Sequence, residues 1–567
     1  MIGRMSEDVL TRMDRRASVW VGLAVAVLYV LTFSSVPTSD GQSFIGMIDD
    51  ALAHGRIEFP ETSNISNAPF SYYAVFWLQW AATRVGLHRS TLQVFHVLNA
   101  AVSGLAASWF YRTIRVAGCD PVWAFVGTWL AATSYGVWYF ANGEAHHIGL
   151  AILIFLFYRL ALLRRDPAGP RYATLIGLGL LNALAVFFHQ EHFIFGLAAV
   201  ALLAWERPWR RSVPESVAYG VSGSLGTFAI IYLLGRLVMG KQSLEAIAHW
   251  YFWPLFGLAH DYRAYVPEPL WVIAARLVKG QLTAFDFGVQ VLVDLLGRGE
   301  PGAGARMALY ALLATIALGL MAACLVGLWF GRRRLTGEPG AIAVGALVWL
   351  VSYPVLLAWY FPAVTEYYLK TVPPLVLLVV LGGWAWEHVG AVRIRAAALA
   401  LLIVVAGTNA LTAMVPWYRY GLMRDRLAAA AGVLVGPGDL VISLESGIDP
   451  VFAGHGDALA VKDLLYREGK ARGFDRIREA IADRLDGGHR VLLYNLIPSR
   501  WALVGLDDPG RVGAVHDHYQ RSDFEALQGE LEARYRLVPV LEYWEESKEP
   551  LYLFGQRLTP VFEVRRR

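Results

Sequence analysis

Residues 17–37 read ASVWVGLAVAVLYVLTFSSVP, and Thr38-Ser39-Asp40-Gly41-Gln42 follows at once. The apolar run is about as long as the 20 or so helical residues that cross a bilayer. Arg12, Arg15 and Arg16 precede it and no small-residue cleavage site follows, so we interpret it as a retained span and not a signal peptide. A carboxylate at the edge of hydrocarbon is costly and usually functional. The stretch therefore predicts a membrane protein with an acidic site, Asp40, at one membrane surface.

The composition supports a polytopic membrane protein. Of the 567 residues, 56% are hydrophobic and 17% are charged, with a mean hydropathy of +0.43; a soluble chain carries about 25% charged residues. The formal net charge is +4, and because arginines on one membrane face set orientation, we expect no nucleic-acid partner. Cys119 falls in an expected turn and Cys324 inside an expected span, which argues against a disulfide between them.

Eleven apolar segments are expected to span the membrane. Two of them, on either side of His189-Gln190-Glu191-His192, are short for a straight crossing and could instead form one long, broken or re-entrant element. The expected spans are 17–37, 92–112, 121–141, 146–163, 173–188, 192–205, 216–239, 307–330, 341–361, 366–386 and 394–415.

Basic residues predict the orientation of these spans. Loop arginines fall on one side, which the positive-inside rule makes cytoplasmic together with the N-terminus. They are Arg112, Arg115, Arg164, Arg165, Arg171, Arg207, Arg210, Arg211, Arg332, Arg333, Arg334, Arg393 and Arg395. The loops with Asp40, Glu144, His189 to His192 and Glu366 then face outward. An odd number of spans places the C-terminal segment outside as well.

Two regions outside the spans have their own character. The outer loop 240–306 contains the aromatic run 249–254, typical of an interfacial segment, and its part 268–296 predicts a surface helix or a pair of short helices. After residue 415 the composition changes. Strand-like 440–444, 490–496, 538–543 and 551–554 alternate with helical 461–485 and 523–535. We therefore expect a transmembrane domain over 1–415 and an extracytoplasmic α/β domain over 416–567.

Four features of residues 17–415, in this order, resemble the glycosyltransferase C superfamily, in particular its branch of protein O-mannosyltransferases and lipid A aminoarabinose transferases. The first is Asp40 after the first span, followed by a short helix over 44–54. The second is the stretch from Asn67-Ala68-Pro69-Phe70-Ser71-Tyr72-Tyr73 to Trp77, similar to the family's Pro-Pro-Leu-Tyr-Tyr-Trp. The third is Glu144 at the mouth of a span. The fourth is Tyr367-Tyr368-Leu369-Lys370-Thr371-Val372-Pro373-Pro374, similar to the family's Arg-Tyr-Leu-Leu-Pro segment.

The resemblance implies a glycosyltransferase that takes a sugar from a polyprenyl phosphate. Asp40 is then the candidate general base, and Glu144 orients the acceptor or shares the proton. Candidates for binding the donor or acceptor are Tyr72, Tyr73, His146, His147, His189, Glu191, His192, Tyr368 and Lys370. Implied partners are a polyprenyl-phosphate sugar, a lipid, glycan or protein acceptor, and membrane lipids.

Each candidate also has a structural interpretation. Asp40 could cap the helix that follows it, Asp49 and Asp50 suit a solvated helix face, and Lys370 could extend to lipid headgroups. The histidines next to Glu144 and Glu191 suggest either a divalent metal site or a hydrogen-bonding cluster. No recognised ligand spacing is present, so no metal ligands are assigned; no cofactor is certain from the sequence, which leaves a divalent metal open.

Three functions compete. The first is an inverting glycosyltransferase of a bacterial-type plasma (inner) membrane, acting on its outer face. The second is a transporter or flippase of a lipid-linked glycan, which should carry polar residues near mid-span and inverted repeats. The third is a non-catalytic assembly protein with the same fold. The notable acids lie at span ends on one side and no repeat is visible, which favours the enzyme.

Overall fold

The computed structural model describes residues 2–34, 45, 48–49, 51–52, 69–87, 90–142, 146–165, 172–253, 269–298, 304–359, 365–418, 433–443, 456–494, 496–497, 521–545 and 557–567. By its internal contacts the chain divides into two units. The helical unit contains the described residues up to Phe33 and most of those up to Val415, and the sheet unit consists mainly of the described residues from Pro416 onward.

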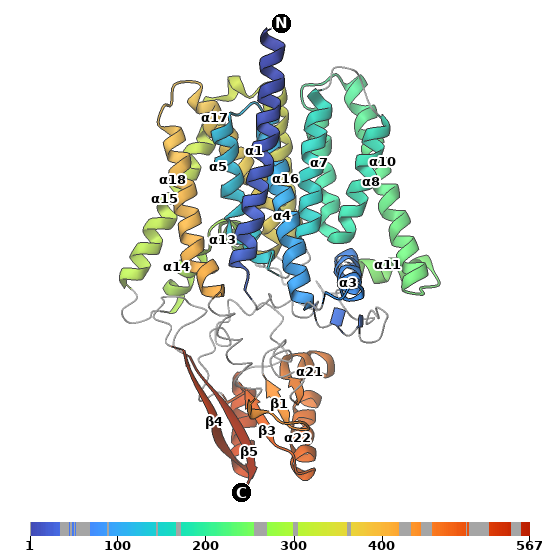
Figure 1. The fold of residues 1–567 in the computed structure, drawn as a ribbon, viewed down its shortest axis with the longest axis vertical. Helices are drawn as coiled ribbons and strands as arrows, with labels where there is room; N and C mark the ends of the chain where they lie inside the picture. The colour runs from blue at the N-terminus through green and yellow to red at the C-terminus, as the bar shows by residue number, and fades with distance from the viewer. Residues whose placement is uncertain are drawn as a thin grey trace. The chain divides into compact units, whose positions relative to one another are not determined.

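The helical unit is a bundle of apolar helices (Figure 1). Its α-helices are α1 (Ile2–Thr32), α3 (Pro69–Arg84), α4 (Thr91–Val116), α5 (Pro121–Ala132), α6 (Tyr135–Phe140), α7 (His146–Arg165), α8 (Tyr172–Phe188), α9 (Phe195–Ala204), α10 (Trp209–Leu233), α11 (Leu244–Trp253), α13 (Leu270–Phe285), α14 (Phe287–Arg298), α15 (Gly304–Phe330), α16 (Glu338–Trp359), α17 (Val372–Glu387) and α18 (Ile394–Asn409). Short 3-10 or π segments are η2 (Gln190–Ile194), η3 (Leu234–Val238), η5 (Arg332–Arg334), η6 (Thr365–Thr371) and η7 (Ala410–Met414).

The helices confirm the expected polytopic membrane protein. In the described part of the chain, 8 helices are long and apolar enough to cross a membrane, and three shorter apolar helices cover Pro121–Ala132, Tyr172–Phe188 and Gln190–Ala204. Together they correspond one for one to the expected spans. The chain breaks at His189, where α8 gives way to the turn η2 before α9. The stretch 268–296 forms a pair of helices, α13 and α14, which meet at Asp286.

Helix α1, the span that precedes Asp40, is fixed by close packing. A Cβ atom on Gly22 would lie 2.5 Å from the carbonyl oxygen of Gly104 in α4, so only glycine lets these two backbones touch. Further along α1, the buried Tyr29 hydroxyl donates to the Ala132 carbonyl of α5 at 2.7 Å. Large apolar side chains on the outer side of α1, such as Val27 and Val30, are exposed, as expected for a helix that faces lipid.

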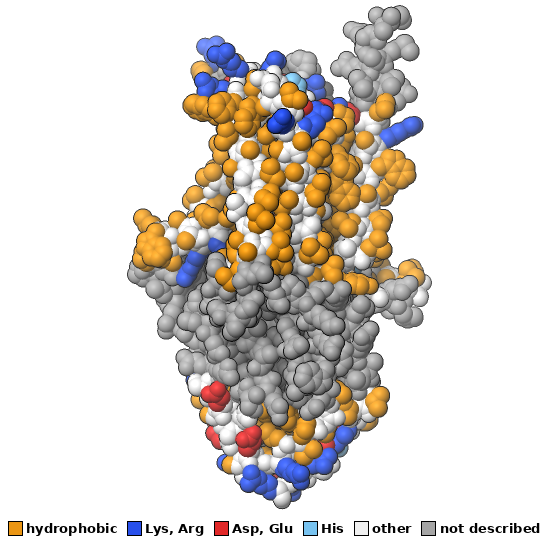
Figure 2. Space-filling model, turned by 90° about the vertical axis from the view of Figure 1, so that its left-hand side faces the viewer, with side chains coloured by type: hydrophobic (Ala, Val, Ile, Leu, Met, Phe, Trp, Pro, Cys, Tyr) orange, Lys and Arg blue, Asp and Glu red, His pale blue; other side chains and the backbone are white. Residues whose placement is uncertain are grey.

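The described loop arginines lie together at one end of the helical unit. Arg115 of α4 pairs with Asp14 of α1 at 2.8 Å, and Arg395 of α18 pairs with Asp120 before α5 at 2.5 Å and with Glu387 of α17 at 2.9 Å. The first pair joins α4 to α1, and the other two join α18 to the start of α5 and the end of α17. Figure 2 shows Lys and Arg side chains at this end, next to a broad apolar surface. Which side of the membrane this end occupies stays a prediction.

The sheet unit is an α/β fold with a mixed five-stranded sheet of order β2-β1-β3-β5-β4. Strands β1 (Leu440–Ser443), β2 (Asp457–Ala460) and β3 (Val491–Tyr494) are parallel, whereas β5 (Arg557–Arg566) is antiparallel to β3 and to β4 (Tyr535–Glu545). The helices are α21 (Val461–Glu468), α22 (Lys470–Asp486) and α23 (Arg521–Arg534). Side chains of both helices and strands, among them Ile442, Ile477 and Phe524, form its core.

The sequence-based elements of the sheet unit were partly right. β1, β3, α23 and the centre of β4 lie where we expected them, but the single helix expected over 461–485 is two helices. The break falls at Gly469, whose φ of +78° is a conformation that favours glycine. β2 and β5 were not predicted, and the strand expected at 551–554 lies outside the described residues.

Candidate functional site

Three segments gather titratable side chains at the end of the helical unit away from the arginines. α7 begins there with His146 and ends at Arg165 on the arginine side. η2 follows the end of α8, and η6 leads into α17, whose far end holds Glu387 in its pair with Arg395. Helix ends leave backbone groups exposed to solvent or side chains, so this is where a bundle of apolar helices can accommodate polar groups.

A buried ion pair forms the centre of this cluster. Lys370 Nζ of η6 donates to Glu191 Oε2 of η2 at 2.8 Å and lies 3.2 Å from His189 Nδ1. The exposed fraction is 0% for the Lys370 side chain and 2% for that of Glu191. His189 Nδ1 also lies 3.1 Å from Glu191 Oε1, so the imidazole contacts both partners of the ion pair. The paired charges offset the cost of burial only because both partners are present.

Two further histidines border the ion pair. The His146 ring lies 4.4 Å from the His189 ring, centroid to centroid. His192 Nδ1 lies 3.3 Å from the Tyr353 hydroxyl of α16, and a Cβ atom on Gly149 of α7 would lie 2.2 Å from His192 Nε2. His192 is therefore enclosed between α7 and α16. The cluster is defined here as His146, His189, Glu191, His192 and Lys370.

His147, although next to His146, belongs to a different contact. Its Nε2 lies 2.6 Å from the carbonyl oxygen of Val137 in α6, so it joins the short helix α6 to the start of α7. The hydrogen bond to the backbone gives His147 a structural task. The sequence-based proposal that it binds donor or acceptor has no support from this contact.

The tyrosines predicted from the motifs are dispersed. Tyr368 lies on η6, two residues from Lys370, and is fully buried against α13, where a Cβ on Gly280 would be 2.4 Å from its ring carbon Cε2. Tyr73 is half-buried on α3, and the side chain of Tyr72 lies outside the described part. The structure thus places Tyr368 beside the cluster and leaves the contribution of Tyr72 and Tyr73 as a proposal.

Asp40 and Glu144, the predicted catalytic residues, lie outside the described residues, so their roles also stay proposals. Each neighbours a described element: α1 ends at Thr32, and α7 begins with His146. Asp49 is exposed and accepts a hydrogen bond from the Thr91 hydroxyl of α4, in agreement with a solvated helix face.

In the described part of the chain, no three His, Cys, Asp or Glu side chains are arranged to hold a metal ion. The Lys370 ammonium occupies the centre of the histidine cluster and hydrogen-bonds the carboxylate that a cation would use. The described donors therefore do not fit a divalent metal. Cys119 and Cys324 are both free and buried, which confirms that they are not paired.

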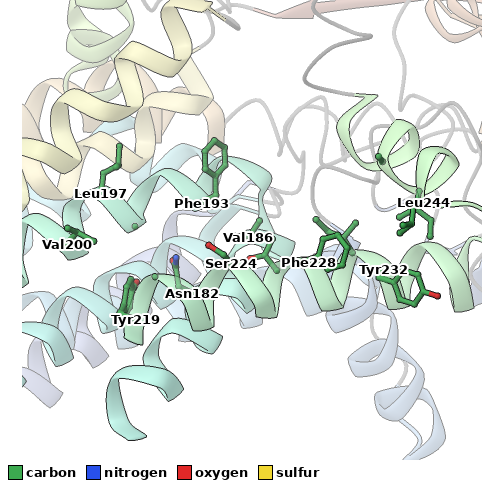
Figure 3. Close-up of a pocket in the computed structure, with 17 residues that line it drawn as sticks. Asn182, Val186, Phe193, Leu197, Val200, Tyr219, Ser224, Phe228, Tyr232 and Leu244 are labelled. Atoms are coloured by element: carbon green, nitrogen blue, oxygen red, sulfur yellow. The ribbon is translucent and has the colours of Figure 1, made fainter. Parts of the chain in front are cut away.

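A lipid-facing groove lies next to η2, and it was not predicted from the sequence. It has a volume of about 580 Å³ and lies between α8, α9, α10 and α11 (Figure 3). Val186 lies three residues before His189, and Phe193 directly follows His192, so the groove reaches the base of η2. Its walls are mainly apolar, with exposed Phe193, Leu197 and Phe228. Asn182 Oδ1 and the Tyr219 hydroxyl are buried along it without a hydrogen-bond partner among the described residues.

Tyr251 and Tyr353 were also missed. Tyr251, in the run we interpreted as interfacial, is 3% exposed, and its carbonyl accepts from Gln190 Nε2 at 2.5 Å. The contact connects α11 to the turn η2, next to Glu191. Tyr353 follows Ser352 within an otherwise apolar helix, and these hydroxyls are the sequence signal that could have pointed to a polar partner.

Comparison with solved structures finds chains with partial similarity over most of this chain. ArnT from Cupriavidus metallidurans, bound to undecaprenyl phosphate, has a TM-score of 0.49 and 11% identity over 96% of this chain and 97% of that one. The Archaeoglobus fulgidus oligosaccharyltransferase has a TM-score of 0.47 and 14% identity over 95% and 73%. Arabinofuranosyltransferase AftD from mycobacteria has a TM-score of 0.44 and 13% identity over 97% and 40%.

No protein-family model matches the sequence. No curated protein sequence matches it either. Because each TM-score quoted is below 0.5 and each identity is 14% or less, the function of this chain has to be argued from its own residues.

Proposed function

We propose that this chain is an integral-membrane glycosyltransferase that transfers a sugar from a polyprenyl-phosphate donor to an acceptor at the outer face of a bacterial-type plasma membrane. The observation that carries the proposal is the lipid-facing groove that reaches η2, the turn in which Glu191 pairs with Lys370. An apolar groove beside a turn that carries charged and hydrogen-bonding groups suits a ligand with a long hydrocarbon chain and a charged head.

The groove suits the first isoprene units of the donor. Its volume of about 580 Å³ falls within the roughly 300–1,000 Å³ typical of ligand sites. Glycines 196, 220 and 223 line it without side chains, so a methyl-branched chain can approach the helix backbones. With the chain in the groove, the phosphate and sugar would lie near η2.

The reaction itself needs a base and a phosphate partner. In our proposal Asp40 takes the proton from the acceptor hydroxyl, whose oxygen attacks the anomeric carbon. The bond from that carbon to the donor phosphate breaks, and polyprenyl phosphate leaves with the electron pair. Attack from the side opposite the phosphate inverts the anomeric configuration. Glu144 orients the acceptor, while Lys370, held by Glu191, and His189 provide the positive and hydrogen-bonding surroundings of the departing phosphate.

The placement of the buried charges favours an enzyme over the transporter. Lys370 lies two residues before α17 and Glu191 lies in the turn between α8 and α9, so this charged pair is at the ends of helices. A transport pathway places such groups near the bilayer midplane. Turnover separates the enzyme from both the transporter and the non-catalytic assembly protein.

The test is transfer by the purified protein, kept in native lipid, from a labelled polyprenyl-phosphate sugar to extracted envelope acceptors. We expect labelled product and release of polyprenyl phosphate, both insensitive to a chelator. Movement of the intact labelled lipid across a vesicle membrane without product would establish the transporter instead. Lack of both turnover and transport would leave the assembly protein.

A further inference from the structure

A second cavity lies at the arginine end of the helical unit, on the surface of α1 and α4. Its volume is about 520 Å³, and it is lined by Arg15, Arg16, Val19, Trp20, Leu23 and Arg112. The proposed transfer reaction uses none of these residues. The cavity combines three guanidinium groups at one end with apolar side chains at the other.

One of the three guanidiniums is fixed in place. Arg112 Nε of α4 donates to the Ser18 hydroxyl of α1 at 2.8 Å, and Ser18, fully buried, donates in turn to the Arg15 carbonyl at 2.8 Å. Arginine has five N–H donors, and this contact uses a single one. The two terminal nitrogens of Arg112 make no hydrogen bond to the residues that the structure describes, so they are available to a ligand.

The charges around the cavity are not neutralised within the described part of the chain. Other arginines at the same end have carboxylate partners: Arg115 pairs with Asp14, and Arg207 pairs with Glu215 at 2.6 Å. Arg15, Arg16 and Arg112 form no ion pair with any described carboxylate. Three clustered positive charges repel one another, and an anion between them would lower that cost.

The apolar wall continues from the arginines along one face of α1. Val19 and Trp20 follow Arg16 by three and four residues, and Leu23 by seven, which is the spacing of one helix face. Their exposed fractions are 48%, 69% and 51%. Indole side chains such as that of Trp20 are typical of the membrane interface. Below the charged groups, this wall can therefore lie against acyl chains.

From this combination we infer that the cavity is a binding site for one anionic phospholipid. The phosphate binds the guanidiniums of Arg15, Arg16 and Arg112, since planar guanidinium groups bind phosphate oxygens in pairs. The acyl chains lie along Val19, Trp20 and Leu23. A headgroup with two phosphates binds more tightly than one with a single phosphate because three cations face it. The bound lipid clamps α1 to α4 and so stabilises the folded protein.

The experiment measures lipid binding and thermal stability of the delipidated full-length protein. The probes are a phospholipid with two phosphates, phosphatidylglycerol, phosphatidylcholine and inorganic phosphate. The test variant is Arg15→Gln/Arg16→Gln/Arg112→Gln. The matched control, Arg332→Gln/Arg333→Gln/Arg334→Gln, removes the same charge from η5, which does not line the cavity.

We expect wild type and control to bind one anionic lipid and to gain thermal stability, in the order two phosphates, one phosphate, phosphatidylcholine. The test variant should bind it at least about tenfold more weakly, the effect of losing more than one charge-assisted contact. Equal losses in both triple variants would show a non-specific charge effect and overturn the proposal. Stabilisation by inorganic phosphate to the same degree would show an anion site instead of a lipid site.

Two single variants keep the test decisive if removing Arg15 and Arg16 disturbs insertion of α1. Arg112→Gln leaves both topogenic arginines in place, and Trp20→Ala alters only an exposed side chain. Both should weaken binding of the anionic lipid, and Trp20→Ala should leave any response to inorganic phosphate unchanged. Unaltered lipid binding in both would refute the site.

Discussion

The ammonium group of Lys370 and the carboxylate of Glu191 form a 2.8 Å ion pair that joins two segments 179 residues apart, with both side chains shielded from water. Removing one partner leaves the other charge buried and alone, at a cost of about 3–5 kcal/mol. We therefore expect Lys370→Met and Glu191→Gln each to lower thermal stability markedly, and the double variant to lose less than the sum of the two.

Sugar-transfer assays distinguish a purely structural role of this ion pair from a role in binding the donor phosphate. The double variant should regain stability and still fail in sugar transfer, because the phosphate would lose its cationic partner. Lys470→Met, at a lysine that is 48% exposed in the sheet unit, is the control and should change neither property. Normal transfer by a stable double variant would limit the pair to a structural role.

Asp40→Asn should leave the protein folded and inserted but remove most turnover. Asparagine keeps the shape and can still cap a helix, yet it cannot take a proton at neutral pH. A general base contributes about 10²–10⁴-fold to the rate. Variants of matched thermal stability would be compared in the transfer assay. If Asp40→Asn transfers sugar at a near-normal rate, the base has to be sought at Glu144 or Asp49.

Sequence patterns predicted the helices better than the site. Runs of apolar residues such as 366–386 must be helical in hydrocarbon because every backbone group needs a partner, and each expected span has its helix. The motifs also identified Lys370, His189 and Glu191. Their mutual contact was not predictable, since it joins turns from distant parts of the chain.

The groove was not predicted from the sequence for a related reason. Gly220 and Asn182 look like ordinary residues of lipid-facing helices, and only the packing of α8 against α10 places them along one cavity. Similarly, β5 was missed because its arginines resemble a polar tail, although Val561 and Val564 face the core. Long-range packing decides these features, and local periodicity does not report it.

Filling the groove should weaken binding of the donor lipid. A Cβ on Gly220 would meet no atom within 4 Å, so Gly220→Leu places its side chain in the open groove without straining the helices. We expect the KM for the polyprenyl-phosphate sugar to rise about tenfold with kcat little changed, the pattern of lost ground-state binding. Gly177→Leu is the matched control, because Gly177 of α8 is equally open and does not line the groove. Equal effects of the two substitutions would contradict the lipid site.

The orientation predicted from the arginines can be tested with an engineered cysteine. Cys119 and Cys324 are both buried, so neither should react strongly with a polar thiol reagent. A cysteine replacing Ala471, an exposed residue of α22 in the sheet unit, should be labelled from outside in intact spheroplasts. A cysteine at Arg333, on η5, should react only after permeabilisation. The reverse pattern would invert the topology and place the proposed active site on the cytoplasmic side.

Asp286, in the turn between α13 and α14 and outside the expected spans, should make stability depend on pH. Burial raises its pKa from 3.8 to about 7, opposed by the hydrogen bond from the Gly288 backbone N–H at 2.9 Å. Between these two pH values the folded protein holds a proton that the unfolded chain has released. Stability should therefore fall as pH rises from about 4 to about 7, and stay level above that.

Asp286→Asn keeps the acceptor for Gly288 and carries no charge, so the variant should lack this decline and exceed wild type in thermal stability at pH 8. Asp483→Asn, at an exposed aspartate of α22, serves as control and should follow the wild-type profile. A variant that tracks wild type at every pH would show that Asp286 is ionised in the folded protein throughout, with its charge stabilised at the start of α14.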